Sequence, residues 1–240
     1  MRSLLLFALL LLPATILASE EFTVYPSGTG GTHPTIAAAV ADAEDGDTIF
    51  LMAGTLSGPG NRDVLVDRDI DILNGEVESP VIDCGGSPSE PHRALILEYC
   101  DALLSGLVMR GGYADNGGAV RIEEGAPTIE YCVFENNTAG SAGGALHIFE
   151  DSQVLVTECV FAGNYCEDAG GAISNDQESS LTLERCSFLY NGAAQGGHLY
   201  SRQDATIAIE RCILAFGHEG AATAGYYSGP VTLACSDVFA

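Results

Sequence analysis

The sequence predicts an all-β fold, a right-handed parallel β-helix with three short strands per coil, and three repeated features carry this prediction. Glycine pairs recur in steps of 26, 27 and 26 residues, at 117–118, 143–144, 170–171 and 196–197. Cysteines recur in steps of 27, 27 and 26 residues, at Cys132, Cys159, Cys186 and Cys212. Two further columns share this period: Phe134, Phe161, Phe188 and Leu214, then Asn137, Asn164, Asn191 and Gly217. Columns with one period indicate that each unit is a coil of a solenoid.

Each unit contains short alternating segments separated by turn residues, as at 118–122, 127–131 and 133–135. Three such segments in a coil of this length favour a parallel β-helix over a helical repeat or a propeller blade. Stacked coils about 4.8 Å apart place equivalent residues in straight columns. Besides the Phe column, the predicted inward columns are Val120, Leu146, Ile173 and Leu199, and Ile129, Val156, Leu183 and Ile209.

Two polar columns have structural interpretations. Asn tolerates a left-handed backbone, so the Asn column is expected at a bend, with its amides hydrogen-bonded from coil to coil. The Cys column is expected to hold buried, reduced thiols, because parallel Cβ atoms about 4.8 Å apart exceed the roughly 3.8 Å that a disulfide needs. Cys84, Cys100 and Cys166 lie outside the column and are the candidates for disulfides. Either Cys235 or Ser236 continues the column.

The ends of the chain predict its organisation. Residues 1–19 are expected to be a signal peptide, because Arg2 precedes the apolar run 4–12 and small residues follow at Ala14, Ala18 and Ser19. Residues 20–46 are expected to form a capping segment whose 35–43 stretch is a short amphipathic helix. Residues 47–240 are expected to form about seven coils, with Leu107 and Met109 in the Cys and Phe columns. The C-terminal end of the β-helix is expected to be missing, since no capping segment follows.

Composition excludes several classes of function. The formal net charge is −24, and all nine basic residues are Arg. Such a surface repels phosphate backbones and anionic lipids, so we expect no nucleic-acid partner, and the mature chain has no second apolar run long enough to span a membrane. We expect an elongated monomer, exported in bacterial fashion to the cell surface, the extracellular medium or the periplasm.

Two stretches resemble known families. Residues 46–55, which follow the Ala-rich predicted helix, resemble the capping segment of secreted pectate-lyase-like β-helix proteins. The Gly-Gly-Ala-aliphatic units (117–120, 143–146 and 170–173), with Phe-x-x-Asn at 134–137, 161–164 and 188–191, resemble the repeats of polymorphic outer-membrane proteins. The resemblance covers nearly all of the mature chain. It implies the fold and leaves function open, because this fold hosts lyases, hydrolases, esterases, epimerases and adhesins.

No complete catalytic set is found. Of the residues expected in polygalacturonase-like enzymes, 217–219 (Gly-His-Glu) is one fragment, and the absence of Lys excludes another. The segment 89–93 resembles the Asp-Pro-His-Glu motif of alginate epimerases, with Arg93 in place of the final acid. We therefore assign no catalytic residue and predict a non-enzymatic binding, adhesion or structural module. The alternative is a lyase or hydrolase that acts on an extracellular polyuronide.

The candidate binding surface follows from alternation. If the first inward column faces the core, its neighbours face outward: Arg121 and Glu123, His147 and Phe149, Ser174 and Asp176, Tyr200 and Arg202. Exposed aromatics with Arg and acids would suit an extended glycan or a cell-surface component. The candidate ligand-binding residues are Arg121, His147, Phe149, Asp176, Tyr200 and Arg202. The simpler interpretation, an ordinary solvated sheet face, stays open.

A second face carries Glu130, Thr157, Glu184 and Glu210, beside Tyr131, Glu158, Arg185 and Arg211. Stacked carboxylates could bind Ca²⁺, which prefers oxygen ligands. Ion pairing with Arg185 and Arg211 is the alternative that we prefer. No cofactor and no metal ligand is assigned.

Overall fold

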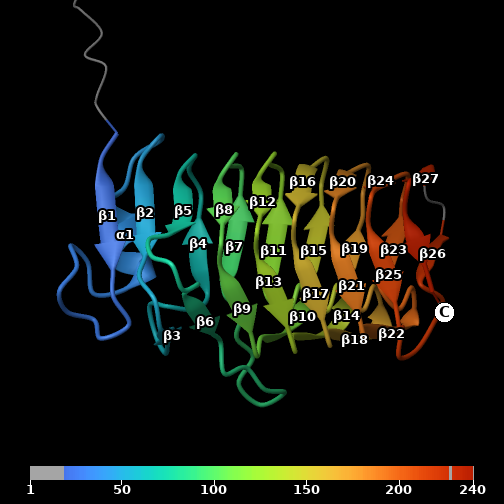
Figure 1. The fold of residues 1–240 in the computed structure, drawn as a ribbon, viewed down its shortest axis with the longest axis horizontal. Helices are drawn as coiled ribbons and strands as arrows, with labels where there is room; N and C mark the ends of the chain where they lie inside the picture. Colours follow the sequence, from blue (N-terminus) through green and yellow to red (C-terminus); the bar gives the residue numbers. More distant parts are fainter. Residues whose placement is uncertain (1–18, 227–228, 240) are drawn as a thin grey trace, which may run out of the picture.

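The computed structural model describes residues 19–226 and 229–239, and these form an elongated solenoid of parallel strands with both ends of the coil stack visible in Figure 1. The predicted signal peptide, apart from Ser19, lies outside the described residues. Successive coils add one strand to each of three long sheets, which follow the stack, whereas a fourth sheet has strands in four coils only.

Three long sheets form the walls. Sheet A has nine strands: β1 (Glu21–Val24), β2 (Thr48–Leu51), β5 (Asp71–Asn74), β8 (Leu103–Ser105), β12 (Thr128–Glu130), β16 (Gln153–Thr157), β20 (Ser180–Glu184), β24 (Thr206–Glu210) and β27 (Val231–Ala234). Sheet B has eight: β3 (Thr55–Ser57), β6 (Val81–Asp83), β9 (Val108–Arg110), β13 (Val133–Glu135), β17 (Val160–Ala162), β21 (Ser187–Leu189), β25 (Ile213–Ala215) and β28 (Asp237–Val238). Sheet C has seven: β4 (Val64–Val66), β7 (Leu95–Glu98), β11 (Val120–Glu123), β15 (Leu146–Phe149), β19 (Ile173–Asn175), β23 (Leu199–Arg202) and β26 (Thr223–Tyr226). The three predicted strands per coil form these walls, although four coils carry a fourth strand as well, and the nine strands of sheet A exceed the seven coils expected.

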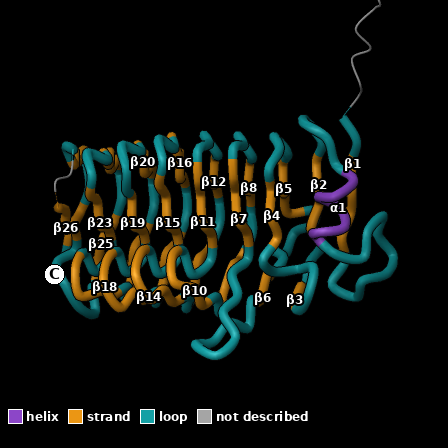
Figure 2. Tube along the Cα trace, turned by 180° about the vertical axis from the view of Figure 1, so that it is seen from behind, coloured by secondary structure: helices purple, strands orange, loops and turns teal. Residues whose placement is uncertain are grey.

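A fourth sheet was not predicted. Sheet D consists of β10 (Tyr113–Asn116), β14 (Thr138–Ala142), β18 (Tyr165–Ala169) and β22 (Gly192–Gln195), of which β10, β14 and β18 are labelled side by side in Figure 2. Their small and polar residues lack the apolar alternation that marks a half-buried strand. The glycine pairs connect sheet D to sheet C where the coils approach closely. A Cβ on Gly118 would lie 2.2 Å from the Gly144 carbonyl oxygen, so a side chain cannot be placed there.

The interior consists of the predicted inward columns. Val120, Ile129 and their equivalents in later coils are buried and pair in register. The rings of Phe134 and Phe161 stack at 4.8 Å, and those of Phe161 and Phe188 at 4.7 Å. Met109 pairs with Phe134 in sheet B, which confirms its predicted place in the Phe column. Each buried side chain of this size contributes on the order of 1.5–3 kcal/mol by transfer from water.

The Asn column is a continuous chain of buried hydrogen bonds. The Nδ2 of Asn137 donates to Oδ1 of Asn164 at 3.0 Å, and Asn164 donates to Asn191 in the same way at 3.0 Å. The predicted bonding between coils is therefore confirmed. The predicted left-handed backbone is wrong by one residue, because the positive φ angles fall on Asn136, Gly163 and Tyr190. The bend precedes the Asn, and the Asn side chain turns inward to bond neighbouring backbone groups.

The column ends at a buried histidine. Gly217 occupies the next Asn position, and the Nδ2 of Asn191 instead lies 3.2 Å from Nδ1 of His198. The same Nδ2 donates to the Phe161 carbonyl at 2.9 Å, so Nδ1 of His198 is the acceptor and the imidazole proton is on Nε2. That Nε2 has no partner, and burial lowers the pKa of His198 to about 4.

The cysteines are free thiols, all eight of them within the described residues. In the Cys column the backbone N–H of Cys132 donates to the sulfur of Cys159 at 3.4 Å. The N–H of Cys212 donates to the hydroxyl of Ser236 at 3.1 Å, so Ser236 continues the column and Cys235 is exposed. The buried, reduced column is confirmed. The other disulfide candidates, Cys84, Cys100 and Cys166, are buried and unpaired as well.

The N-terminal helix covers the first coils. The helix α1 (Ile36–Asp42) begins after Thr35, whose hydroxyl accepts a hydrogen bond from the N–H of Ala38 at 3.2 Å. The helix lies at the N-terminal end of the stack, as Figure 2 shows. Its side chains Ile36 and Val40 are buried. The same segment supplies β1, the first strand of sheet A, which the repeat did not predict. Within the described ranges no helix is long and apolar enough to cross a membrane.

Replacing Cys159 tests the structural role of the Cys column. The change Cys159→Ala removes the sulfur that accepts from Cys132 and leaves a buried N–H unpaired, which costs about 1–3 kcal/mol. Cys159→Ser restores an acceptor, as Ser236 does naturally, and should lose less. Urea unfolding measures both, with Cys84→Ala as the control for a buried thiol outside the column. Equal stability of the Ala and Ser variants would contradict this role.

Acid titration tests His198. Its pKa is about 4 in the folded chain against an ordinary 6.5, so the fold favours the neutral form. The unfolded chain binds the proton first as pH falls, and stability is therefore lost progressively between pH 6.5 and 4, by up to roughly 3 kcal/mol. His198→Asn should flatten that part of the stability–pH profile. A variant profile parallel to the wild-type one would show that His198 is not responsible.

Candidate functional site

The outer face of sheet C carries all six candidate residues in two rows that run along the solenoid. The first row places Arg121, His147, Ser174 and Tyr200 in register on β11, β15, β19 and β23. The second row lies two residues further along each strand and contains Glu123, Phe149, Asp176, Arg202 and Tyr226. The structure therefore brings the predicted set together on one face.

The expected exposure of this face is wrong for three of the six candidates. Tyr200 is only 5% exposed, His147 7% and Asp176 1%. Arg121, Phe149 and Arg202 are partly exposed. Outward side chains of successive coils are about 4.8 Å apart, so long side chains that attract one another lie across the face and cover the shorter ones. The alternation predicted the direction of each side chain correctly but not its burial.

Asp176 is the centre of an ionic network. Its Oδ2 lies 2.9 Å from Nε2 of His147 and 3.0 Å from Nη2 of Arg202. Its Oδ1 accepts a hydrogen bond from the hydroxyl of Ser174 at 3.1 Å. Burial by itself raises the pKa of Asp176, but the hydrogen bond from His147 and the charges of His147 and Arg202 outweigh it and hold the pKa below its ordinary value. Asp176 is therefore a buried carboxylate that orients the side chains of His147 and Arg202.

A second group surrounds Phe149. The His147 ring stacks on the Phe149 ring with centroids 4.8 Å apart, and the Arg121 guanidinium carbon lies 5.1 Å from the Phe149 centroid. Arg121 also pairs with Glu123 and, at 3.7 Å, with Glu98. His147 thus joins this group to the Asp176 network. The result is one continuous, rigid arrangement with a guanidinium at each end.

Two buried atoms of the arrangement have no hydrogen-bond partner, namely Nδ1 of His147 and Nε of Arg202. Buried polar atoms are almost always paired, so an unpaired pair on an outer face points to a ligand or water. Tyr226 is a residue that sequence reasoning missed. It is exposed and pairs in register with Arg202, and the same alternation carried one coil further would have found it.

The second predicted face is an ion-paired surface. Arg185 contacts the carboxylate of Glu158, pairs with Glu184 at 3.2 Å and donates to the hydroxyl of Thr157 at 3.1 Å. The preferred ion-pair interpretation is confirmed at Arg185. In the described part of the chain no group of three or more His, Cys, Asp or Glu residues is arranged to hold a metal ion. The described residues therefore give no support to the calcium hypothesis.

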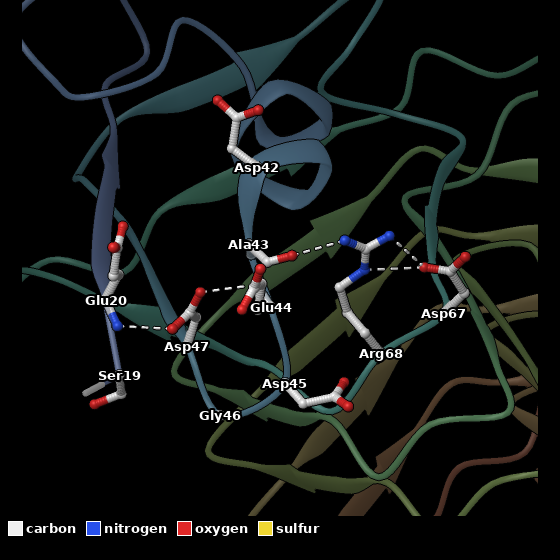
Figure 3. A pocket seen from close by; sticks show the side chains of 10 residues that line it. All are labelled: Ser19, Glu20, Asp42, Ala43, Glu44, Asp45, Gly46, Asp47, Asp67 and Arg68. Carbon is white, nitrogen blue, oxygen red and sulfur yellow. Dashed lines mark hydrogen bonds and ion pairs between the residues drawn. The ribbon is translucent and has the colours of Figure 1, made fainter. Parts of the chain in front are cut away.

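A cavity of about 680 Å³ lies at the N-terminal end and is lined mainly by acids (Figure 3). The acids of this cavity that form hydrogen bonds stabilise the fold. The Asp47 carboxylate accepts from the backbone N–H groups of Glu20 and Glu44, each at 2.7 Å. Arg68 donates to the Ala43 carbonyl at 2.7 Å and pairs with Asp67 at 2.9 Å. These bonds attach the end of α1 and the start of β1 to the next coil.

The two catalytic-motif fragments do not form a site. His92 lies 2.6 Å from the Asp63 carboxylate, which also accepts from the N–H of Arg93, and His92 bridges to Tyr113 at the edge of sheet D. The fragment 217–219 follows β25. The loop that contains His92 follows β6, which lies five strands away from β25 in sheet B. His92 has a local structural role, and the two fragments do not meet in one site.

Comparisons with known proteins agree with the fold. The crystal structure of pectate lyase Pel9A is similar to this chain, with a TM-score of 0.51 and 13% identity over 84% of this chain and 64% of that one. The match spans less than two thirds of that lyase, and at this identity it shows the fold alone. No curated protein matches the chain. A family model described as the right handed beta helix region matches residues 94–234, more than half of the chain, and the chain belongs to this right-handed β-helix family.

Proposed function

We propose that this protein is exported and that it binds an extracellular glycan or a similar cell-surface component, as a monomer, through the outer face of sheet C and without cleaving it. The observation that carries the proposal is the network around Asp176. Residues 1–19, with their apolar run and small residues, support export.

The network is not required by the fold. A buried ion pair loses much of its attraction to desolvation, and packed apolar side chains often stabilise as well. Here Asp176 holds Arg202, and His147 holds Phe149, in single orientations. Side chains fixed before binding lose less conformational freedom when a ligand arrives, which raises affinity. This is the arrangement expected of a binding surface.

The charge of the face favours a ligand rich in hydroxyl groups. Arg121 and Arg202 are donors, while Glu98 and Glu123 beside them are acceptors, so both kinds of hydrogen bond are offered to hydroxyls. The net charge of −24 repels polyanions at a distance. Rows of side chains that repeat in every coil suit an extended chain lying along the solenoid. A neutral polysaccharide fits these properties best.

Substitutions at the exposed end of the arrangement test the proposal. Arg121→Gln and Phe149→Ala should each weaken binding to neutral extracellular polysaccharides about tenfold or more on a glycan array. Arg121→Gln should keep stability within about 1 kcal/mol, since the acids that Arg121 pairs with are partly exposed. Arg202 is not used, because its loss would strip the buried Asp176 of a cation.

Matched controls are Arg211→Gln and Tyr131→Ala, an exposed Arg and an exposed aromatic on other faces. These controls remove one positive charge and one aromatic ring, as the test variants do, and they should bind the polysaccharides as the wild type does. Affinities that fall equally in controls and test variants, or that do not fall at all, would reject this face.

A reaction assay separates binding from cleavage. The purified chain, incubated with a panel of polyuronides and neutral glycans, should release neither unsaturated nor reducing ends. Product that appears with the wild type and disappears in Arg121→Gln would replace the binding proposal with the lyase or hydrolase alternative.

A further inference from the structure

A second surface, at the corner between sheets B and D, has features of its own. One residue follows each sheet B strand at this corner, and in successive coils it is Gly111, Asn136, Gly163, Tyr190 and Phe216. All five have a positive φ, between 54° and 64°. Gly and Asn adopt this conformation at little cost, whereas bulky side chains do so rarely. The coils of β21 and β25 place aromatic rings where earlier coils place residues suited to the bend.

The two rings gain little from burial. Tyr190 is 62% exposed and Phe216 56%, and their rings stack on each other with centroids 5.3 Å apart and planes 15° apart. A left-handed backbone and an exposed aromatic surface are both unfavourable for stability alone. Other bulky residues of this chain, such as Tyr99 and Tyr131, also combine a positive φ with an exposed ring, so these two features alone do not indicate a function. What distinguishes Tyr190 and Phe216 is that their exposed rings stack on each other beside a cavity.

A cavity lies beside the pair. It has a volume of about 500 Å³ and is lined by Tyr190, Phe216, Gly217 and His218. Gly217 stands where the three preceding coils have Asn, so this corner also lacks the side chain that closes the column elsewhere. The Nε2–H of His198, buried and without an acceptor, lies 3.7 Å from the position that a Cβ on Gly217 would occupy. Ring stack, cavity and missing Asn thus coincide at one corner.

We infer that the corner formed by Tyr190, Phe216, Gly217 and His218 is a second ligand site, which stacks one uncharged sugar ring on the aromatic pair. The C–H face of a sugar ring packs on an aromatic surface, while the Tyr190 hydroxyl and the His218 imidazole offer hydrogen bonds to the ring hydroxyls. A cavity of this size suits one ring-sized group. The negative charge of the protein disfavours an acidic sugar. The inference does not rest on the binding proposed for sheet C.

The test uses substitutions to a residue type that this corner already carries in an earlier coil. Tyr190→Asn and Phe216→Asn install the residue found at Asn136, so they remove the ring while relieving the backbone. Saturation-transfer NMR and titration with methyl β-glucoside, methyl α-mannoside and methyl β-galactoside measure binding, with galacturonate as the charged counterpart. We expect at least one neutral glycoside to bind the wild type, and each variant to weaken it about tenfold or more, with an unchanged or higher melting temperature.

Tyr131→Asn is the matched control. Tyr131 is 59% exposed and has a φ of 53°, but it lies at the corner between sheets A and B and lines no part of this cavity. It should bind as the wild type does, and so should Phe149→Ala on sheet C. The inference is wrong if no neutral glycoside binds, if galacturonate binds best, if the Asn variants bind normally, or if Phe149→Ala abolishes the same binding. If Arg121→Gln and Phe149→Ala bind polysaccharides as the wild type does, only the function proposed for sheet C is rejected.

Discussion

The in-register stacking of parallel strands is the constraint on which the rest of this molecule depends. Each coil pairs with the next through backbone hydrogen bonds at a spacing of about 4.8 Å, so equivalent residues lie directly above one another. The Phe rings adopt that spacing, stacking at 4.8 and 4.7 Å. A slip of one residue would turn every inward side chain to solvent, and the uniform apolar columns therefore enforce the register.

The same stacking satisfies the buried polar groups. An Asn or a Cys at a fixed place in successive central coils meets its own copy in the next coil, and each pair supplies both donor and acceptor. Where a column breaks, another side chain takes over the bond. His198 accepts from Asn191 beside Gly217, and Ser236 replaces a thiol beside Cys212. These substitutions mark the last coils as chemically different from the central ones.

The outer surface follows from stacking too, although its chemistry is free to vary. Side chains far apart in sequence, such as His147, Asp176 and Arg202, become immediate neighbours because their strands are adjacent. Family membership explains the scaffold and says little about what it binds, since this fold carries many activities. The two candidate sites are therefore argued from their own contacts, and they differ in kind. One is a rigid ionic network on a sheet, and the other is an aromatic pair at a bend.

The sequence by itself determined the repeat, the inward columns, the coil-to-coil Asn bonds and the helical cap, because period, alternation and the Ala-rich segment before Gly46 are properties of a single chain. It also placed Arg121, Phe149 and Arg202 on one outer face, since alternation fixes which way a strand residue points. Only the tertiary structure decided that Asp176, His147 and Tyr200 are buried there, because burial depends on how long side chains from neighbouring coils lie across one another. Sheet D and the position of the left-handed bend were likewise decided in three dimensions. Sheet D ends at the glycine pairs, where the backbones of neighbouring coils pack tightly, and no alternation of apolar residues records it.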